Sequence, residues 1–176
     1  MEKGCWPHLR STTDSYHVDE TSIKIKGCWH YLYRAVDSTG QTIDFLLSAK
    51  RDAKAAKRFF RRMLKGTPGR SPRVITVDKN PAYPPAVEKL KAEGGLPDQY
   101  QLRQSKYLNN LVEQDHRFLK RRVNPGLGFF SFRTARRTIT GYEARHMIMK
   151  GQIVGVGKGE IQGQVRFVGG LFGVAA

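Results

Sequence analysis

The sequence predicts a mixed α/β domain in which a central sheet is flanked by helices. Runs of alternating or β-branched residues occur before residue 48, and apolar residues recur at helical spacing from residue 52 onward. Hydrophobic residues make up 39% of the 176-residue chain, which is enough for a buried core. The two cysteines, Cys5 and Cys28, lack CxxC spacing, so neither a disulfide scaffold nor a zinc ribbon is expected.

Three strands are expected at the start of the chain, and the short turns between them favour an antiparallel meander. They cover residues 16–25, 29–36 and 42–47, with a turn over 37–40. A helix should follow from Asp52, its predicted N-cap, to the stop at Gly66.

The later elements alternate between short strands and helices. Strands are predicted over 73–77 and 99–104, and helices over 86–93, 109–122 and 132–149. Residues 151–176 are rich in glycine, which predicts loop with one short strand over 164–167. This order of elements fits a ribonuclease-H-like mixed sheet with flanking helices.

The charge of the chain indicates its binding partner. Lys and Arg number 31 against 15 Asp and Glu, so the formal net charge is +16 and the isoelectric point is about 10.2. A polyanion is the expected partner. Because no apolar run is long enough to span a bilayer and no secretory signal is recognisable, nucleic acid is favoured over a membrane, in a cytoplasmic protein.

Carboxylates are scarce in this chain, so their positions are informative. Asp19 lies in the first strand, Asp78 directly follows the strand over 73–77, and Glu113 lies in the helix over 109–122. Three carboxylates at one point can hold two Mg²⁺ ions for phosphoryl transfer. Spacing alone is weak support, because most acidic residues lie at the surface.

One face of the helix over 109–122 strengthens this interpretation. His116, Arg117 and Lys120 follow Glu113 by three, four and seven residues, which places them along the same stripe. Such a stripe suits a metal ligand beside a DNA strand, whereas the alternative is an exposed ion pair of Glu113 with Arg117. Asp115 falls about 200° away, toward the packing side, and is the weaker candidate.

Five segments together resemble the catalytic domain of bacterial insertion-sequence transposases of the DDE class, specifically the group that moves replicatively through cointegrates. They are Val18–Thr21, Tyr31–Asp37, Asp78–Tyr83, Tyr107–Arg117 and Phe132–Ile139. The resemblance implies a ribonuclease-H-like fold, hydrolytic nicking at the element's ends, and attack of the freed 3′-hydroxyl on target DNA. It also implies a homo-oligomer that brings two ends together in the nucleoid.

Carried over by position, the resemblance makes Asp19, Asp78 and Glu113 both the catalytic triad and the ligands of two Mg²⁺ ions, for which Mn²⁺ could substitute. It implies that Lys120 contacts the transposon end. The other expected DNA-binding residues are His116, Arg117, Arg121, Arg133, Arg136 and Arg137. The expected domains are a truncated N-terminal remnant over 1–13 without a helix-turn-helix, the DDE catalytic domain over 14–150, and a Gly-rich tail over 151–176.

Several alternatives stay open. A non-catalytic DNA-binding remnant would bind DNA without joining it, and a generic endonuclease would cut DNA that lacks element ends. Glu20 is expected to be a surface acid or a residue behind the metal ligands. Trp29, Tyr31 and Tyr33 alternate along a strand and could stack on bases, although packing on the sheet is the favoured interpretation.

Overall fold

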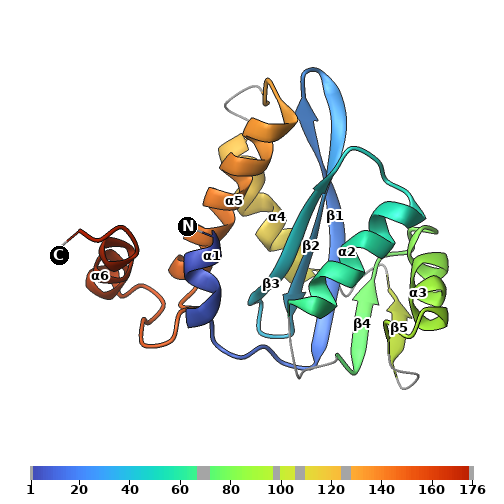
Figure 1. The fold of residues 1–176 in the computed structure, drawn as a ribbon, viewed down its shortest axis with the longest axis horizontal. Helices are drawn as coiled ribbons and strands as arrows, with labels where there is room; N and C mark the ends of the chain where they lie inside the picture. Colours follow the sequence, from blue (N-terminus) through green and yellow to red (C-terminus); the bar gives the residue numbers. More distant parts are fainter. Residues whose placement is uncertain (1, 67–71, 97–99, 106–109, 124–127, 175–176) are drawn as a thin grey trace. The chain divides into compact units, whose positions relative to one another are not determined.

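The fold comes from a computed structural model that describes residues 2–66, 72–96, 100–105, 110–123 and 128–174 (Figure 1). The chain divides into two compact units. The larger unit is Thr12–Ser131 and contains the five-stranded sheet, and the smaller unit combines Met1–Ser11 with Phe132–Ala176. Among the described residues, no helix has both the length and the apolar character needed to cross a bilayer.

The sheet of the larger unit is mixed, and its strand order is β3-β2-β1-β4-β5. The strands are β1 (Ser15–Ile25), β2 (Cys28–Asp37), β3 (Thr42–Ser48), β4 (Val74–Val77) and β5 (Gln101–Gln104). The predicted antiparallel meander is confirmed, since β2 pairs antiparallel with both β1 and β3. β4 pairs parallel with β1 and β5, so the chain crosses over the sheet between β3 and β4 and again between β4 and β5.

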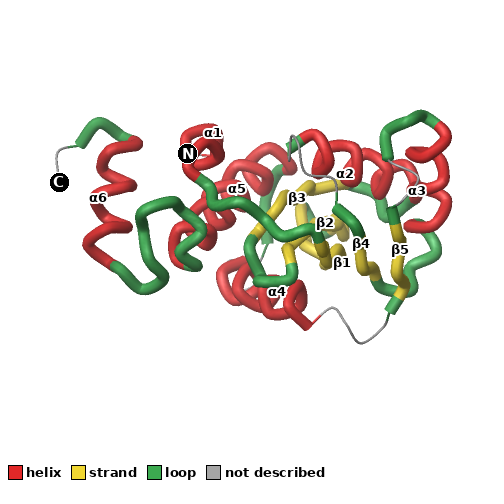
Figure 2. Tube along the Cα trace, turned by 90° about the horizontal axis from the view of Figure 1, so that it is seen from below, coloured by secondary structure: helices red, strands yellow, loops and turns green. Residues whose placement is uncertain are grey.

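Three helices cover this sheet, with α2 and α3 on one face and α4 on the other (Figure 2). They span Ala53–Lys65, Tyr83–Ala92 and Asn110–Val123. Asp52 caps α2 as predicted, because its side chain accepts a 2.7 Å hydrogen bond from the Ala55 amide. Phe59, Phe60 and Met63 of α2 are fully buried against the sheet core, which fixes the helix that follows the meander.

The smaller unit is helical. It contains α1 (Glu2–Cys5), a 3₁₀ turn η1 (Trp6–His8), α5 (Phe132–Met149) and α6 (Ile161–Leu171). Its core is formed by Cys5, Ala144, Met147, Ile148, Ile153 and Val156.

The strand predicted over 164–167 is wrong, because these residues belong to α6. Phe167, Val168 and Leu171 recur at helical spacing and pack on the core of the smaller unit. That burial stabilises a helix in spite of its glycines, whose individual cost is about 1 kcal/mol each. At Gly163 a Cβ atom would lie 2.6 Å from a carboxylate oxygen of Glu160, so a larger residue there would displace the end of the Glu160 side chain.

Buried tyrosines make the stability of the larger unit sensitive to alkaline pH. Burial, and then the negative charges of Glu20 and Asp52, raise the pKa of Tyr33 well above its usual value of about 10. Above pH 10 the unfolded chain loses this proton while the folded chain keeps it. The free energy of unfolding should therefore fall as pH rises, by about 1.4 kcal/mol per pH unit for each such tyrosine.

Tyr33→Phe should remove one of these contributions. At pH 7 the variant should be as stable as the parent or slightly more stable, because the Tyr33 hydroxyl has no hydrogen-bond partner among the described residues. Urea unfolding at pH 7, 10 and 11 measures both effects. An unchanged dependence on pH between 10 and 11 would show that Tyr33 ionises normally in the folded protein.

Candidate active site

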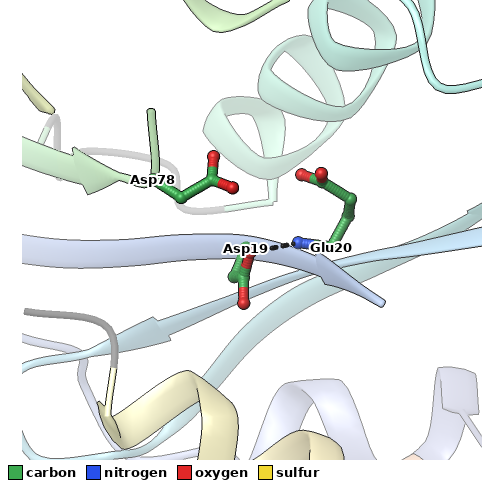
Figure 3. A group of neighbouring side chains, drawn as sticks. All are labelled: Asp19, Glu20 and Asp78. Carbon is green, nitrogen blue, oxygen red and sulfur yellow. Dashed lines mark hydrogen bonds between the residues drawn. The ribbon is translucent and has the colours of Figure 1, made fainter. Parts of the chain in front are cut away.

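The site begins where β4 ends beside the middle of β1. The parallel register pairs Val18 with Val77, so Asp19 and Asp78 are the next residues on the two strands. Asp78 leaves the sheet at this point, and its side chain approaches β1 (Figure 3). One carboxylate oxygen each from Asp19, Glu20 and Asp78 lies within 4.8 Å of the others. Two acids of β1 and one that directly follows β4 therefore gather at one point of a strongly basic chain.

Glu20 lies at the centre of a hydrogen-bond network. Alternation along β1 sends its side chain toward the face of the sheet that α2 and α3 cover, opposite to Asp19 (Figure 3). Its carboxylate accepts hydrogen bonds from Asn80 Nδ2 at 2.9 Å, from the hydroxyl of Tyr83 and from the guanidinium of Arg51. The side chain is only 2% exposed, so of the two expected placements the surface acid is wrong and a residue behind the metal ligands remains. Glu20 instead ties β1 to the segment after Asp78.

The surroundings of Asp78 disfavour the charged form of its carboxyl group. Partial burial raises its pKa, and the negative charges of Glu20 and Asp19 raise it further. The Asn80 amide, which donates a 3.0 Å hydrogen bond to Oδ1, and Arg51, 3.9 Å from Oδ2, act in the opposite direction. A cation placed among these oxygens would relieve the repulsion, so the geometry favours binding of positive charge.

Asp19 faces α4. Its Oδ1 accepts a 2.9 Å hydrogen bond from the Glu20 amide, and its Oδ2 lies 3.5 Å from Nε2 of His116. His116 lies on the buried side of α4, so one turn of this helix lies beside the acidic cluster. The sequence predicts His116 as a DNA-binding residue, whereas the structure places its side chain in the interior beside Asp19.

Glu113 is exposed on α4, one turn before His116, and it is outside the group of oxygens within 4.8 Å. Its position three residues before His116 places it on the same side of the helix. Arg117, Lys120 and Arg121 are also exposed on α4. The helix thus presents one acid and three cations beyond the buried histidine.

Asp115 has a different role from Glu113. Its Oδ2 accepts a 3.1 Å hydrogen bond from Nη2 of Arg34, whose side chain is fully buried in β2. This ion pair joins α4 to the sheet, in agreement with the prediction that Asp115 points to the packing side. The remaining predicted DNA contacts, Arg133, Arg136 and Arg137, are exposed on α5 in the smaller unit.

The donor set fits a hard divalent cation. Carboxylate oxygens are the ligands that Mg²⁺ prefers, and one or two of them suffice when water and phosphate oxygens complete the shell. Asp19 and Asp78 are the suitable pair, because Glu20 is already engaged by Arg51, Asn80 and Tyr83.

Sequence reasoning missed this supporting network. One signal was available, since Glu20 is an acid directly beside Asp19 in a chain with few acids. Nothing in the sequence pairs it with residues 31, 60 and 63 positions away.

Comparison with known proteins identifies the family. Residues 13–152 match the family described as a DDE domain. The chain is 43% identical over 136 residues to the Staphylococcus aureus transposases of insertion sequence-like element IS431mec and of IS257 in transposon Tn4003. These matches cover 77% of the chain and 58% of each relative, so the chain spans well under two thirds of their length.

Solved structures agree on the fold. The simian T-cell lymphotropic virus intasome matches with a TM-score of 0.60 at 15% identity, over 89% of this chain and 57% of that one. The dimeric HTLV-2 integrase catalytic core matches with a TM-score of 0.53 at 16% identity, over 84% and 93%. Identities this low show the fold alone, and that fold is ribonuclease-H-like, as predicted. The chain therefore belongs to the DDE-domain family of insertion-sequence transposases.

Proposed function

We propose that this chain is the catalytic domain of a DNA transposase, which nicks the ends of an insertion element and transfers the freed 3′-hydroxyl to target DNA. The observation that carries the proposal is the meeting of Asp19 and Asp78 at the end of β4 in a chain of net charge +16. The transposase relatives support it. We assign catalysis to residues 14–150.

In this proposal Asp19 and Asp78 hold the metal, and Glu113 completes the ligand set from α4. A pair of Mg²⁺ ions, or Mn²⁺ in their place, supplies activation of the attacking oxygen and stabilisation of the leaving oxygen in an in-line phosphoryl transfer. His116 keeps α4 against Asp19, and the network of Glu20 positions the segment that carries Asp78.

The proposed partner is DNA, bound through its phosphates. Arg117, Lys120 and Arg121 extend from the acids along α4, and Arg133, Arg136 and Arg137 add cations on α5. Binding should weaken steeply with salt, because each phosphate contact releases a counterion. We also propose that two or more copies assemble to hold both element ends, and that the protein acts in the bacterial nucleoid.

A strand-joining assay tests the proposal. The protein is incubated with pre-nicked element ends, target DNA and Mg²⁺ or Mn²⁺, and joined products are counted. Asp78→Asn should reduce joining at least 100-fold, because several kcal/mol of charge stabilisation depend on the bound metal. Asp14→Asn, an exposed acid outside the cluster, is the matched control and should join normally. Salt-sensitive DNA binding without joining under any metal condition would contradict catalysis.

A further inference from the structure

A pocket of about 270 Å³ lies between the β1–β2 hairpin and the last turns of α4. Its lining residues are Ser22, Ile23, Lys24, Trp29, Leu119, Lys120, Val123 and Gly128. Roughly 10 Å of β1 separates Asp19 from Ser22, a span of about three base pairs of B-DNA. The pocket is therefore within a few nucleotides of any DNA strand that reaches the acids.

The wall of the pocket is apolar and held in place by backbone hydrogen bonds. Ile23, Leu119 and Val123 are buried. The backbone of Phe129 makes two hydrogen bonds to the chain at the end of β1. Its amide donates to the Lys24 carbonyl at 3.1 Å, and its carbonyl accepts from the Lys26 amide at 2.7 Å. Gly128 has a φ of 98°, and a Cβ atom there would lie 2.8 Å from the Lys24 carbonyl oxygen. Only glycine allows this close approach, which brings the backbone at 128 and 129 against the end of β1.

The rim combines an exposed aromatic ring with cations. Trp29 is 59% exposed, unlike the buried Tyr33 of the same strand, so the expected packing on the sheet holds for Tyr33 and not for Trp29. Lys24 Nζ lies 5.7 Å from the Trp29 ring, and Lys120 is exposed. Of the lining residues that the structure describes, none is acidic.

We propose that this pocket binds a single unstacked nucleobase of the DNA strand that the acidic site holds, with Trp29 stacking on the base and Lys24 and Lys120 contacting the flanking phosphates. A nucleobase has planar π-faces that stack on aromatic and apolar side chains, and phosphates flank it along the strand, which matches an apolar wall with a cationic rim. The volume lies just below the roughly 300–1,000 Å³ of drug-sized ligand pockets and suits one small planar group. This inference rests on the proposed function, because it needs DNA at the acids.

Trp29 provides a direct readout. The chain has two tryptophans, so Trp6→Phe leaves Trp29 as the sole tryptophan reporter. Fluorescence is titrated with oligothymidine and with an abasic oligonucleotide of equal length, which has the same phosphates and no bases. Oligothymidine should change the fluorescence of Trp29 and bind more tightly than the abasic strand.

Substitution at the rim gives the size of the effect, measured with a labelled oligothymidine. Trp29→Ala should weaken binding by roughly five- to hundredfold, the loss that corresponds to removing one base–aromatic stack. Trp29→Phe should retain most of the affinity. Phe130→Ala is the matched control, because Phe130 is 89% exposed and does not line the pocket, and it should bind like the parent.

Two results would overturn the inference and leave the proposed function standing. One is equal affinity for the oligothymidine and the abasic strand, with no loss in Trp29→Ala. The other is a change in Trp29 fluorescence with protein concentration in the absence of DNA, which would assign the pocket to a second copy of the chain. Failure to bind either oligonucleotide would instead contradict the proposed function itself.

Discussion

Replacing Glu113 with Gln should abolish strand joining and leave the stability of the protein unchanged. Glu113 is exposed on α4, so the free energy of unfolding should stay within about 0.5 kcal/mol of the parent value. If Glu113 completes the ligand set with Asp19 and Asp78, its loss should reduce joining at least 100-fold. Binding of Mn²⁺ to the protein, followed calorimetrically, should weaken as well.

Glu20→Gln should instead lower the stability of the protein and reduce strand joining less than Glu113→Gln does. In Glu20→Gln the new amide group faces Asn80 Nδ2, the Tyr83 hydroxyl and the Arg51 guanidinium, all of which donate hydrogen bonds to the present carboxylate. The amide keeps one acceptor oxygen and replaces the other with an NH₂ group, so at least one of these donors loses its acceptor, which costs about 1–3 kcal/mol and would be measured by urea unfolding. Joining should fall less than in Glu113→Gln, because Glu20 positions the segment after Asp78 and does not itself bind the metal.

The pair of variants separates two descriptions of the acidic cluster. The geometry groups Glu20 with Asp19 and Asp78, whereas the resemblance to transposases assigns the third position to Glu113. A Glu20→Gln protein that keeps its stability and loses metal binding completely, beside a Glu113→Gln protein with normal joining, would make Glu20 the third ligand.

The positions of Asp19 and Asp78 in the fold could be predicted from the sequence, because the pattern of the strands determines where these two residues lie. Asp78 follows four consecutive buried residues of β4, and such a strand delivers the next residue to the edge of the sheet. The sequence also predicts that Glu113 and Asp115 lie on different sides of α4, because helical geometry alone separates the two side chains.

The ion-pair and hydrogen-bond partners of the buried polar groups could not be predicted from local sequence patterns. Arg34 and Asp115 are 81 positions apart, and no local pattern marks an arginine in a strand as a buried ion pair. The secondary structure of α6 could not be predicted from local patterns either. Its glycines indicate loop, and only the packing of Phe167, Val168 and Leu171 against the core of the smaller unit favours the helix. Contacts between residues far apart in the sequence determine both features, and no short sequence pattern indicates such contacts.

The second large effect is expected at the ion pair between α4 and the sheet. Asp115→Ala removes the carboxylate that lies 3.1 Å from Nη2 of Arg34, a side chain with no exposed surface. Removing one member of a buried ion pair costs about 3–5 kcal/mol, because the remaining charge loses its ion-pair partner in a site shielded from water. Since α4 carries His116 and Glu113, joining should fall together with stability. Urea unfolding at pH 7 measures the loss.

A second Arg–Asp pair in the same unit provides the control. Arg73 Nε lies 3.2 Å from Asp14 Oδ2, but these side chains are 68% and 60% exposed. Asp14→Ala removes the same chemical contact in water, where such pairs contribute about 0–1 kcal/mol. Equal losses in Asp14→Ala and Asp115→Ala would mean that burial of Arg34 does not determine the cost. A loss confined to Asp115→Ala would show that α4 is anchored over the acids by a desolvated charge pair.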